Sequence, residues 1–295
     1  MKIFNLGSIN ADYFYRLPHL PQAGETLASI GYDRGLGGKG ANQSVACARA
    51  GAEIRHLGAI GSEGRWMVER MEDAGVDCTQ VVIVREASGH AIIYVDQAAE
   101  NTIVIHPGAN RAIPDTVLDD ALDQAEDGDL LILQNETCLQ VEAAQLAAER
   151  GVFVIYSAAP FDEAAVRAVL PYVSLLIVNE GEAKALCESF GVALPELPVK
   201  QIVVTKGAQG ATWHNLDTGG LIVMPAFPVK PVDTTGAGDT FAGYLAAGLA
   251  EGASRERAMR LAAAAAAVKV TRAGTADAIP ARQEVEDFLE NQPKL

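Results

Sequence analysis

The segment Asp233-Thr234-Thr235-Gly236-Ala237-Gly238-Asp239, followed directly by Thr240-Phe241-Ala242-Gly243-Tyr244-Leu245, is the stretch around which this chain is organised. Its two glycines allow backbone N–H groups to turn toward a ligand that a Cβ atom would keep away. We predict a helix from Gly238 to about Leu249, whose first N–H groups lack partners and whose dipole is positive at this end. This combination is typical of an anion site, above all a phosphate site.

Asp239 is the unexpected residue of this segment, because a carboxylate stands where an anion should bind. One explanation is that Asp239 accepts the proton of an incoming hydroxyl group while a phosphoryl group is transferred to it. The other is that Asp239 only caps its own helix. This segment alone supports the two interpretations equally.

A second glycine-rich loop, residues 35–43 (GLGGKGANQ), opens a helix of small residues that stops at Gly51. It is not a P-loop, because Gly40 follows Lys39 where serine or threonine is required and Asp33 stands at the place of the first glycine. Four glycines around one lysine indicate backbone held close to a polar ligand, although a flexible loop with an exposed lysine has the same composition.

The second half of the chain alternates regularly between helices and strands. We predict strands at 129–134, 152–156, 175–179 and 201–205, helices at 115–125, 139–150, 163–170 and 180–190, then a hairpin at 210–214 and 221–224 and helices at 254–270 and 282–291. Strands such as 130–133 (LLIL) and 175–178 (LLIV) are apolar throughout, as in a parallel sheet covered on both faces. The predicted fold class is therefore α/β, with three layers (α/β/α) around a central, mostly parallel sheet.

Polar residues follow three of these strands, at Asn135-Glu136, Asn179-Glu180 and Thr205-Lys206-Gly207. Because the carboxyl ends of parallel strands share one edge of the sheet, these side chains should gather there. Asn10 and Asp12 follow the first predicted strand, 2–9, and should join them, although Asn and Asp after a strand are often only turn formers.

Two β-rich runs, 91–95 and 102–106, are joined by the loop 96–101 and predict a hairpin. With the strand-like segment 25–34 they form a small antiparallel sheet inserted into the alternating chain. Such a small sheet is stable only when another part of a protein packs against it. We therefore predict one domain, residues 1–295, with a β lid formed by about residues 11–36 and 88–108, and a homodimer through paired lids.

Composition excludes several classes of function. The chain has 295 residues, 49% of them hydrophobic, which fits one large domain. A net charge of −15 argues against nucleic acid or anionic membrane as a main partner. Four widely spaced cysteines give neither a zinc site nor a disulfide framework. The start lacks a signal-peptide pattern and the run 261–268 is too short to cross a bilayer, so we expect a cytoplasmic protein.

With these residues placed, the chain resembles the ribokinase-like (PfkB) family of carbohydrate kinases over nearly its whole length, and the ribokinase branch of that family most closely. The two family signatures stand here as residues 37–43 (GGKGANQ) and 233–239 (DTTGAGD), and residues 7–12 (GSINAD) and 21–26 (PQAGET) add to the similarity. One glycine-rich match would be weak, but two long signatures about 200 residues apart and in the expected order are strong.

The resemblance implies a role for each matching residue. Asp239 matches the catalytic base, and the anion hole matches Gly236, Ala237 and Gly238. The positions that hold the sugar match Asn10, Asp12, Gly38, Asn42 and Glu136, with Lys39 nearby. Nucleotide positions match Asn179, Thr205, Gly207, Gly210 and Gly238, and the Mg²⁺-linked carboxylate matches Glu182. A loop that binds a monovalent cation, usually K⁺, matches Asp233 and Thr235 with backbone from Lys269, Arg272 and Gly274.

The implied reaction is transfer of the γ-phosphoryl group of ATP to the primary hydroxyl of a furanose sugar, first of all D-ribose to ribose 5-phosphate. A nucleoside, fructose or another pentose is an alternative acceptor, because Asn10 and Asp12 can bind vicinal hydroxyls of either a free sugar or a nucleoside ribose. A sugar-binding protein without catalysis is the alternative from another class, but such a protein should have lost Asp239 or the glycines beside it.

Three features depart from the family pattern. The segment between Asn179 and Gln201 is short, as if one crossover helix were reduced to 193–200, which leaves the nucleotide preference open. Ala278 stands where a serine often serves the cation loop, which predicts an altered K⁺ dependence. The bulky residues 13–15 (YFY) could reshape the sugar or lid region.

Overall fold

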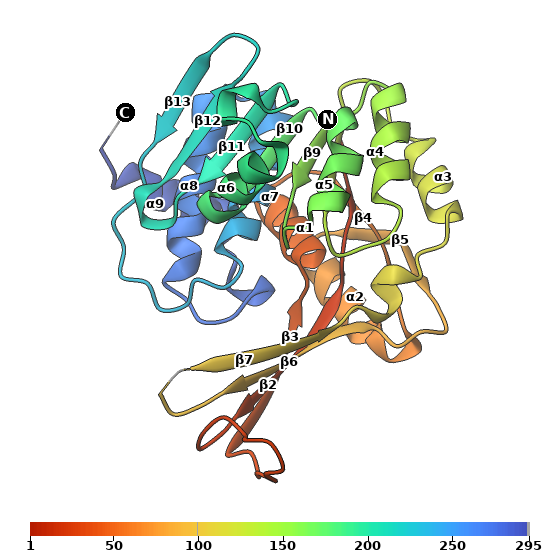
Figure 1. The fold of residues 1–295 in the computed structure, drawn as a ribbon, viewed down its shortest axis with the longest axis vertical. Helices are drawn as coiled ribbons and strands as arrows, with labels where there is room; N and C mark the ends of the chain where they lie inside the picture. Colours follow the sequence, from red (N-terminus) through yellow and green to blue (C-terminus); the bar gives the residue numbers. More distant parts are fainter. Residues whose placement is uncertain (99, 294–295) are drawn as a thin grey trace.

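Nine strands form the large sheet of the computed structural model, which describes residues 1–98 and 100–293 (Figure 1). Their spatial order is β13 (Gly220–Met224), β12 (Ala211–Asn215), β11 (Gln201–Thr205), β10 (Leu175–Asn179), β9 (Phe153–Ser157), β8 (Leu130–Gln134), β1 (Ile3–Leu6), β4 (Ile54–Ile60) and β5 (Asp77–Ile83). Every pairing from β11 to β5 is parallel, and β12 and β13 continue the sheet as an antiparallel hairpin. The predicted α/β class and mostly parallel sheet are confirmed.

Helices cover both faces of this sheet and bury two separate apolar cores. One core is shared by α1 (Lys39–Arg49), α2 (Arg65–Asp73), α7 (Ala237–Ala250), α8 (Arg255–Val270) and α9 (Arg282–Glu290). The other is shared by α3 (Thr116–Leu122), α4 (Gln140–Glu149), α5 (Glu163–Val169) and α6 (Glu180–Phe190). In β8, Ile132 enters the first core while Leu131 and Leu133 enter the second. Because successive residues of a strand face opposite cores, β8 and β10 are apolar except for their last residues, Gln134 and Asn179, as the sequence predicts.

A second, smaller sheet extends away from the large one (Figure 1) and contains the segments that the sequence predicts as a lid, so we refer to it as the lid. Its order is β3 (Gly31–Gly37), β2 (Asn10–Arg16), β6 (Gly89–Val95) and β7 (Asn101–His106). The β2–β3 and β6–β7 pairings are antiparallel, as predicted, whereas the central β2–β6 pairing is parallel. The predicted hairpin loop 96–101 includes Ala99, which lies outside the described residues.

The first strand is shorter than predicted, the second is shifted, and one strand was not predicted. The first strand ends at Leu6, so that Asn10 and Asp12 begin the lid strand β2 instead of ending β1. The strand predicted at 25–34 lies at 31–37, because pairing with β2 stabilises a glycine-rich stretch that propensity disfavours. Strand β5 was not predicted, because its residues are mostly half-buried at the edge of the sheet and carry no clear alternation. The predicted short crossover is confirmed: between α6 and β11 lies a single 3₁₀ turn, Leu194–Glu196.

The alanine-rich run at 261–268 lies within α8 and packs into the first core. Among the described residues, no helix combines the length and the apolarity needed to span a membrane.

Candidate active site

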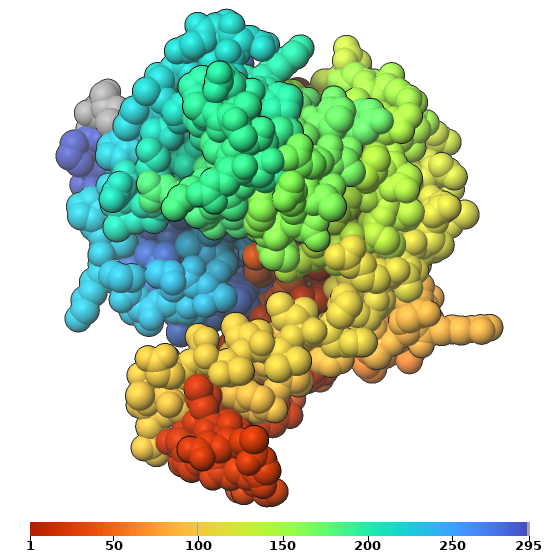
Figure 2. Space-filling view, viewed as in Figure 1, coloured from red at the N-terminus to blue at the C-terminus, as the bar shows by residue number. Residues whose placement is uncertain are grey.

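The two glycine-rich loops meet at one edge of the large sheet, beneath the lid. Strands β8, β10 and β11 end there at Gln134, Asn179 and Thr205, because they run parallel. Figure 2 shows a recess between the lid and the large domain, with atoms from the first part of the chain at its floor. The residues that the sequence predicts at this edge are distributed around this recess and a neighbouring pocket.

The N-terminus of α7 has the backbone of an anion site. Gly236 precedes the helix with φ 73°, a left-handed conformation that favours glycine. The N–H of Ala237 donates to the carbonyl oxygen of Thr234 at 3.2 Å, so this predicted anion-hole donor is engaged within the turn. The N–H groups of Gly236, Gly238 and Asp239 donate no hydrogen bond to any described residue. These groups are therefore available to a phosphate.

Asp239 does not cap its own helix, which answers the question that the sequence leaves open. It lies in the first turn of α7, is 8% exposed, and its carboxylate faces helix α1. Its Oδ2 accepts a hydrogen bond from Nδ2 of Asn42 and its Oδ1 accepts one from Nε2 of Gln43, each at 3.0 Å. Asn42 and Gln43, which are neighbours in the signature at 37–43, thus fix the carboxylate of Asp239 in the signature at 233–239.

Gln43 connects Asp239 to a buried polar network beneath the site. The Oε1 of Gln43 accepts from Nε2 of Gln134 at 2.9 Å, and the same nitrogen donates to Oδ1 of Asn5 at 2.8 Å. Asn5 donates to Oγ of Ser44, which lies 2.8 Å from Nδ1 of His56. All five side chains are fully buried, and burial lowers the pKa of His56 to about 4. The network is therefore uncharged at neutral pH, and it holds Gln43 rigidly.

The predicted sugar-binding residues surround Asp239 on the lid side. Asp12 lies against Gly37, where a Cβ atom would come within 2.1 Å of its Oδ2, so only glycine fits at that position. Burial, and then the charge of Glu136, raise the pKa of Asp12 to about 7. Asn10 accepts from Nδ2 of Asn110 at 2.7 Å, which fixes its amide.

Glu136 and Lys39 complete this side of the site. The carboxylate of Glu136 accepts hydrogen bonds from the hydroxyl of Ser8 and from the backbone N–H of Lys39, the latter at 3.1 Å. The charge of Asp239, followed by the charges of Glu136 and Glu182, raises the pKa of the Lys39 ammonium despite its burial. Lys39 therefore keeps its positive charge near these carboxylates.

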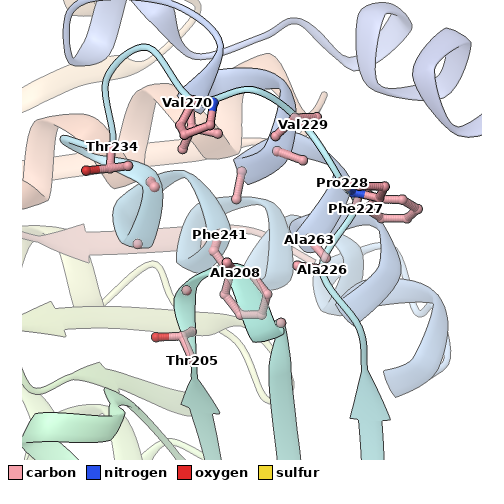
Figure 3. Close-up of a pocket in the computed structure, with 17 residues that line it drawn as sticks. Thr205, Ala208, Ala226, Phe227, Pro228, Val229, Thr234, Phe241, Ala263 and Val270 are labelled. Atoms are coloured by element: carbon pink, nitrogen blue, oxygen red, sulfur yellow. The ribbon is translucent and has the colours of Figure 1, made fainter.

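A pocket of about 400 Å³ lies on the other side of α7, away from the lid (Figure 3). Four predicted nucleotide residues line it: Thr205, Gly207, Gly210 and Gly238. Most of its wall is apolar and comes from α7, α8 and the segment 226–231, with Phe241, Ala263 and Val270 among the lining residues. These wall residues were missed by the sequence analysis, because a run of alanines looks like an ordinary core helix.

Asn179 and Glu182 do not line this pocket. They form a capping box at the start of α6, in which Glu182 Oε2 accepts from Asn179 N at 2.8 Å and Asn179 Oδ1 accepts from Glu182 N at 2.9 Å. Within residues 1–98 and 100–293, no cluster of three or more His, Cys, Asp or Glu side chains could hold a metal ion. A single carboxylate with phosphate oxygens and water is nevertheless a usual environment for Mg²⁺, so Glu182 fits the predicted role.

The residues predicted to bind K⁺ come together beside α7, and the oxygens of Asp233 and Lys269 accept hydrogen bonds from protein groups. Asp233 accepts from the N–H of Thr235 at 2.9 Å and from the N–H of Gly274 at 3.0 Å, and its own carbonyl oxygen accepts from Nζ of Lys269 at 3.1 Å. The carbonyl oxygen of Lys269 accepts from the N–H of Arg272 at 3.0 Å. Burial opposes ionisation of Asp233, yet these N–H groups and Lys269 hold its pKa below the usual value. The ammonium of Lys269 therefore lies at one of the residues predicted to bind K⁺.

Comparisons with known proteins agree with this geometry. A model of the pfkB family carbohydrate kinases matches residues 2–282. A ribokinase of Haemophilus influenzae is 36% identical over 305 aligned positions, which cover 97% of each chain. The structure of Arabidopsis thaliana ribokinase complexed with ribose and ATP is similar with a TM-score of 0.87 and 28% identity, covering 99% of each chain. A Burkholderia thailandensis nucleoside kinase in complex with inosine is similar with a TM-score of 0.83 and 25% identity, covering 98% of this chain and 96% of that one.

Proposed function

Because the chain belongs to the pfkB family of carbohydrate kinases, we propose that it transfers the γ-phosphoryl group of ATP to the 5-hydroxyl group of D-ribose. The observation that carries this proposal is the placement of Asp239, which is buried, held by two amides and adjacent to unpaired N–H groups at the start of α7. The relatives named ribokinase, which cover nearly the whole chain, support ribose as the acceptor.

The acceptor sugar would lie between Asp239 and the lid. Asp12 and Glu136 would accept hydrogen bonds from its hydroxyls, as would the buried Oδ1 of Asn42, which has no protein partner among the described residues. Asp239 would orient the 5-hydroxyl for in-line attack and accept its proton. The N–H groups of Gly236 and Gly238 would stabilise the charge that develops on the transferred group.

ATP would lie with its base in the apolar pocket and its phosphates directed toward the start of α7. Glu182 would hold Mg²⁺, which neutralises phosphate charge when it is bound. K⁺ is the other cofactor that the resemblance implies, and its place would be the loop of Asp233. There the ammonium of Lys269 competes for the carbonyl oxygen of Asp233.

The lid also supports a homodimer. Strand β7 is exposed along its whole length, including Ile103 (51%), Val104 (57%) and Ile105 (59%), and it is an edge strand of the lid sheet. Exposed apolar side chains on an unpaired edge are typical of a surface that another chain covers. A second copy of the lid has the matching chemistry, so light scattering should give twice the monomer mass.

An acceptor screen tests the proposed function. ADP release should be measured with ribose, 2-deoxyribose, fructose, adenosine and inosine at equal concentration. Ribose should give the largest kcat/KM. The similar nucleoside kinase makes a nucleoside the second candidate, and faster turnover of adenosine or inosine would replace ribose with that acceptor.

A further inference from the structure

Lys269 is a buried lysine for which the proposed reaction has no use. It lies in the last turn of α8, where most neighbouring helix residues are alanine, and it is 0% exposed. Its Nζ donates to the backbone carbonyl oxygen of Asp233 at 3.1 Å, and this is its only hydrogen bond to a described residue. An ammonium removed from water is costly unless a specific interaction compensates it, so its position requires an explanation.

The oxygen that Lys269 contacts begins the loop 233–239, which carries the anion-binding N–H groups and Asp239. Carbonyl oxygens are the ligands that proteins offer to K⁺, and an ammonium places the same unit charge on such an oxygen. Each oxygen of the Asp233 carboxylate also accepts one N–H, Oδ1 from Thr235 and Oδ2 from Gly274. Protein groups thus hold the start of the loop.

Ala278 provides an independent observation on the same loop. It is 5% exposed, and its Cβ lies 3.9 Å from the position of a Cβ built on Gly274, whose N–H donates to Asp233. A methyl group at this place offers no oxygen to a cation. Position 278 therefore lacks an oxygen that could have bound a cation, in the same region where the ammonium of Lys269 contacts Asp233.

We propose that the ammonium of Lys269 replaces a bound monovalent cation, holding the loop 233–239 in its phosphate-binding conformation so that the enzyme needs no K⁺. The inference rests on the proposed kinase function for its activity measurement. A lysine near a helix C-terminus also interacts favourably with the helix dipole, but that effect alone would not link the lysine to K⁺.

Two substitutions separate these roles. Lys269→Ala removes the charge and leaves space beside the carbonyl of Asp233, whereas Lys269→Met removes the charge and fills the space. Lys184→Ala is the control, because Lys184 is 78% exposed on α6 and pairs only with Glu188. Each protein is compared in K⁺, Na⁺ and tetramethylammonium at equal ionic strength, by kcat and by melting temperature.

The wild-type enzyme and Lys184→Ala should have the same kcat in all three salts. Lys269→Ala should lose about tenfold in kcat without K⁺, as expected when anion-hole geometry is disturbed, and should regain most of it in K⁺. K⁺ should also raise its melting temperature by about 3 °C over Na⁺, whereas Lys269→Met should respond to K⁺ in neither measurement.

The kcat of the wild-type enzyme in K⁺ and in Na⁺ tests the proposal even if both variants fail to fold. Activation by K⁺ of more than about threefold over Na⁺ overturns the proposal. Equal responses of Lys269→Ala and Lys269→Met to K⁺ overturn it as well. If no acceptor is phosphorylated, the proposed function fails, while the melting temperatures still test the role of Lys269.

Discussion

The acceptor side of the site is polar and tightly hydrogen-bonded, whereas the nucleotide pocket is lined mainly by small and apolar side chains. Around Asp239, the amides of Asn42 and Gln43 both donate to the carboxylate, and Gln43 is itself held by the buried Gln134. Around the pocket, the lining residues from α7 and α8 are Phe241, Gly238, alanines and Val270, and the hydroxyls come from Thr205 and Thr234 (Figure 3). The same helix, α7, separates the two.

This difference indicates where the protein achieves selectivity. A buried polar site rejects a wrong ligand strongly, because any group that the ligand fails to pair stays unpaired and desolvated. An apolar pocket accepts any ligand of the right shape and discriminates weakly. We therefore expect substitutions on the acceptor side to have large effects and changes in the pocket to have small ones.

Asp239→Asn should have the largest effect. The amide retains one oxygen acceptor but cannot take up a proton at neutral pH, so kcat should fall by about 10³-fold. Ribose binding, measured by isothermal titration calorimetry, should persist. Asp217→Asn, in the exposed turn between β12 and β13, is the control and should keep normal turnover. Near-normal kcat for Asp239→Asn would refute the assignment of the base.

Gln43→Met should have the next largest effect. It leaves Oδ1 of Asp239 without its donor and Nε2 of Gln134 with only one of its two acceptors, Asn5. An unpaired buried polar group costs about 2 kcal/mol, which corresponds to about thirtyfold in kcat if it acts in the transition state. KM for ATP should be unchanged. Gln145→Met, exposed on α4, is the control. A loss of unfolding free energy with kcat intact would show that Gln43 is only structural.

Asp12→Asn should change mainly the pH dependence of protein stability and the KM for ribose. The pKa of Asp12 is about 7 in the folded protein, against an unperturbed value of 3.8, so the folded state binds its proton more tightly than the unfolded state. This contribution to stability is complete below about pH 4 and is lost as the pH rises to about 7. In urea titrations, the free energy of unfolding of Asp12→Asn should not show this decline with rising pH.

The same residue should make ribose binding pH-dependent. The ionised carboxylate accepts more hydrogen bonds than the protonated form, so KM for ribose should fall as the pH rises through about 7. Asp12→Asn should raise KM by about tenfold, the loss of one hydrogen bond to a charged group, and abolish this pH dependence. A pH-independent KM in the wild-type enzyme would contradict the role of Asp12.

The contrast between the two sides also separates what the sequence predicts from what it does not. The strands at 130–134 and 175–179 were predictable because burial on both faces makes the first four positions of each strand apolar. The pairing of Gln43 with Asp239 was not, because it joins residues 196 positions apart through side-chain geometry that no local pattern encodes. For Lys269 the sequence indicated only a backbone role, since nothing in an alanine-rich helix shows that its ammonium reaches Asp233.

Replacing ATP by GTP should have the smallest effect of these changes on kcat/KM. The pocket wall offers few hydrogen-bond partners for the edge of a base, so kcat/KM for GTP should lie within about fivefold of the value for ATP. Ala267→Leu, which narrows the pocket, should raise KM for both nucleotides alike, and Ala148→Leu, exposed on α4, should not. A preference for ATP of more than about 10²-fold would mean that the base edge is read by hydrogen bonds. In that case the nucleotide side would be as selective as the acceptor side.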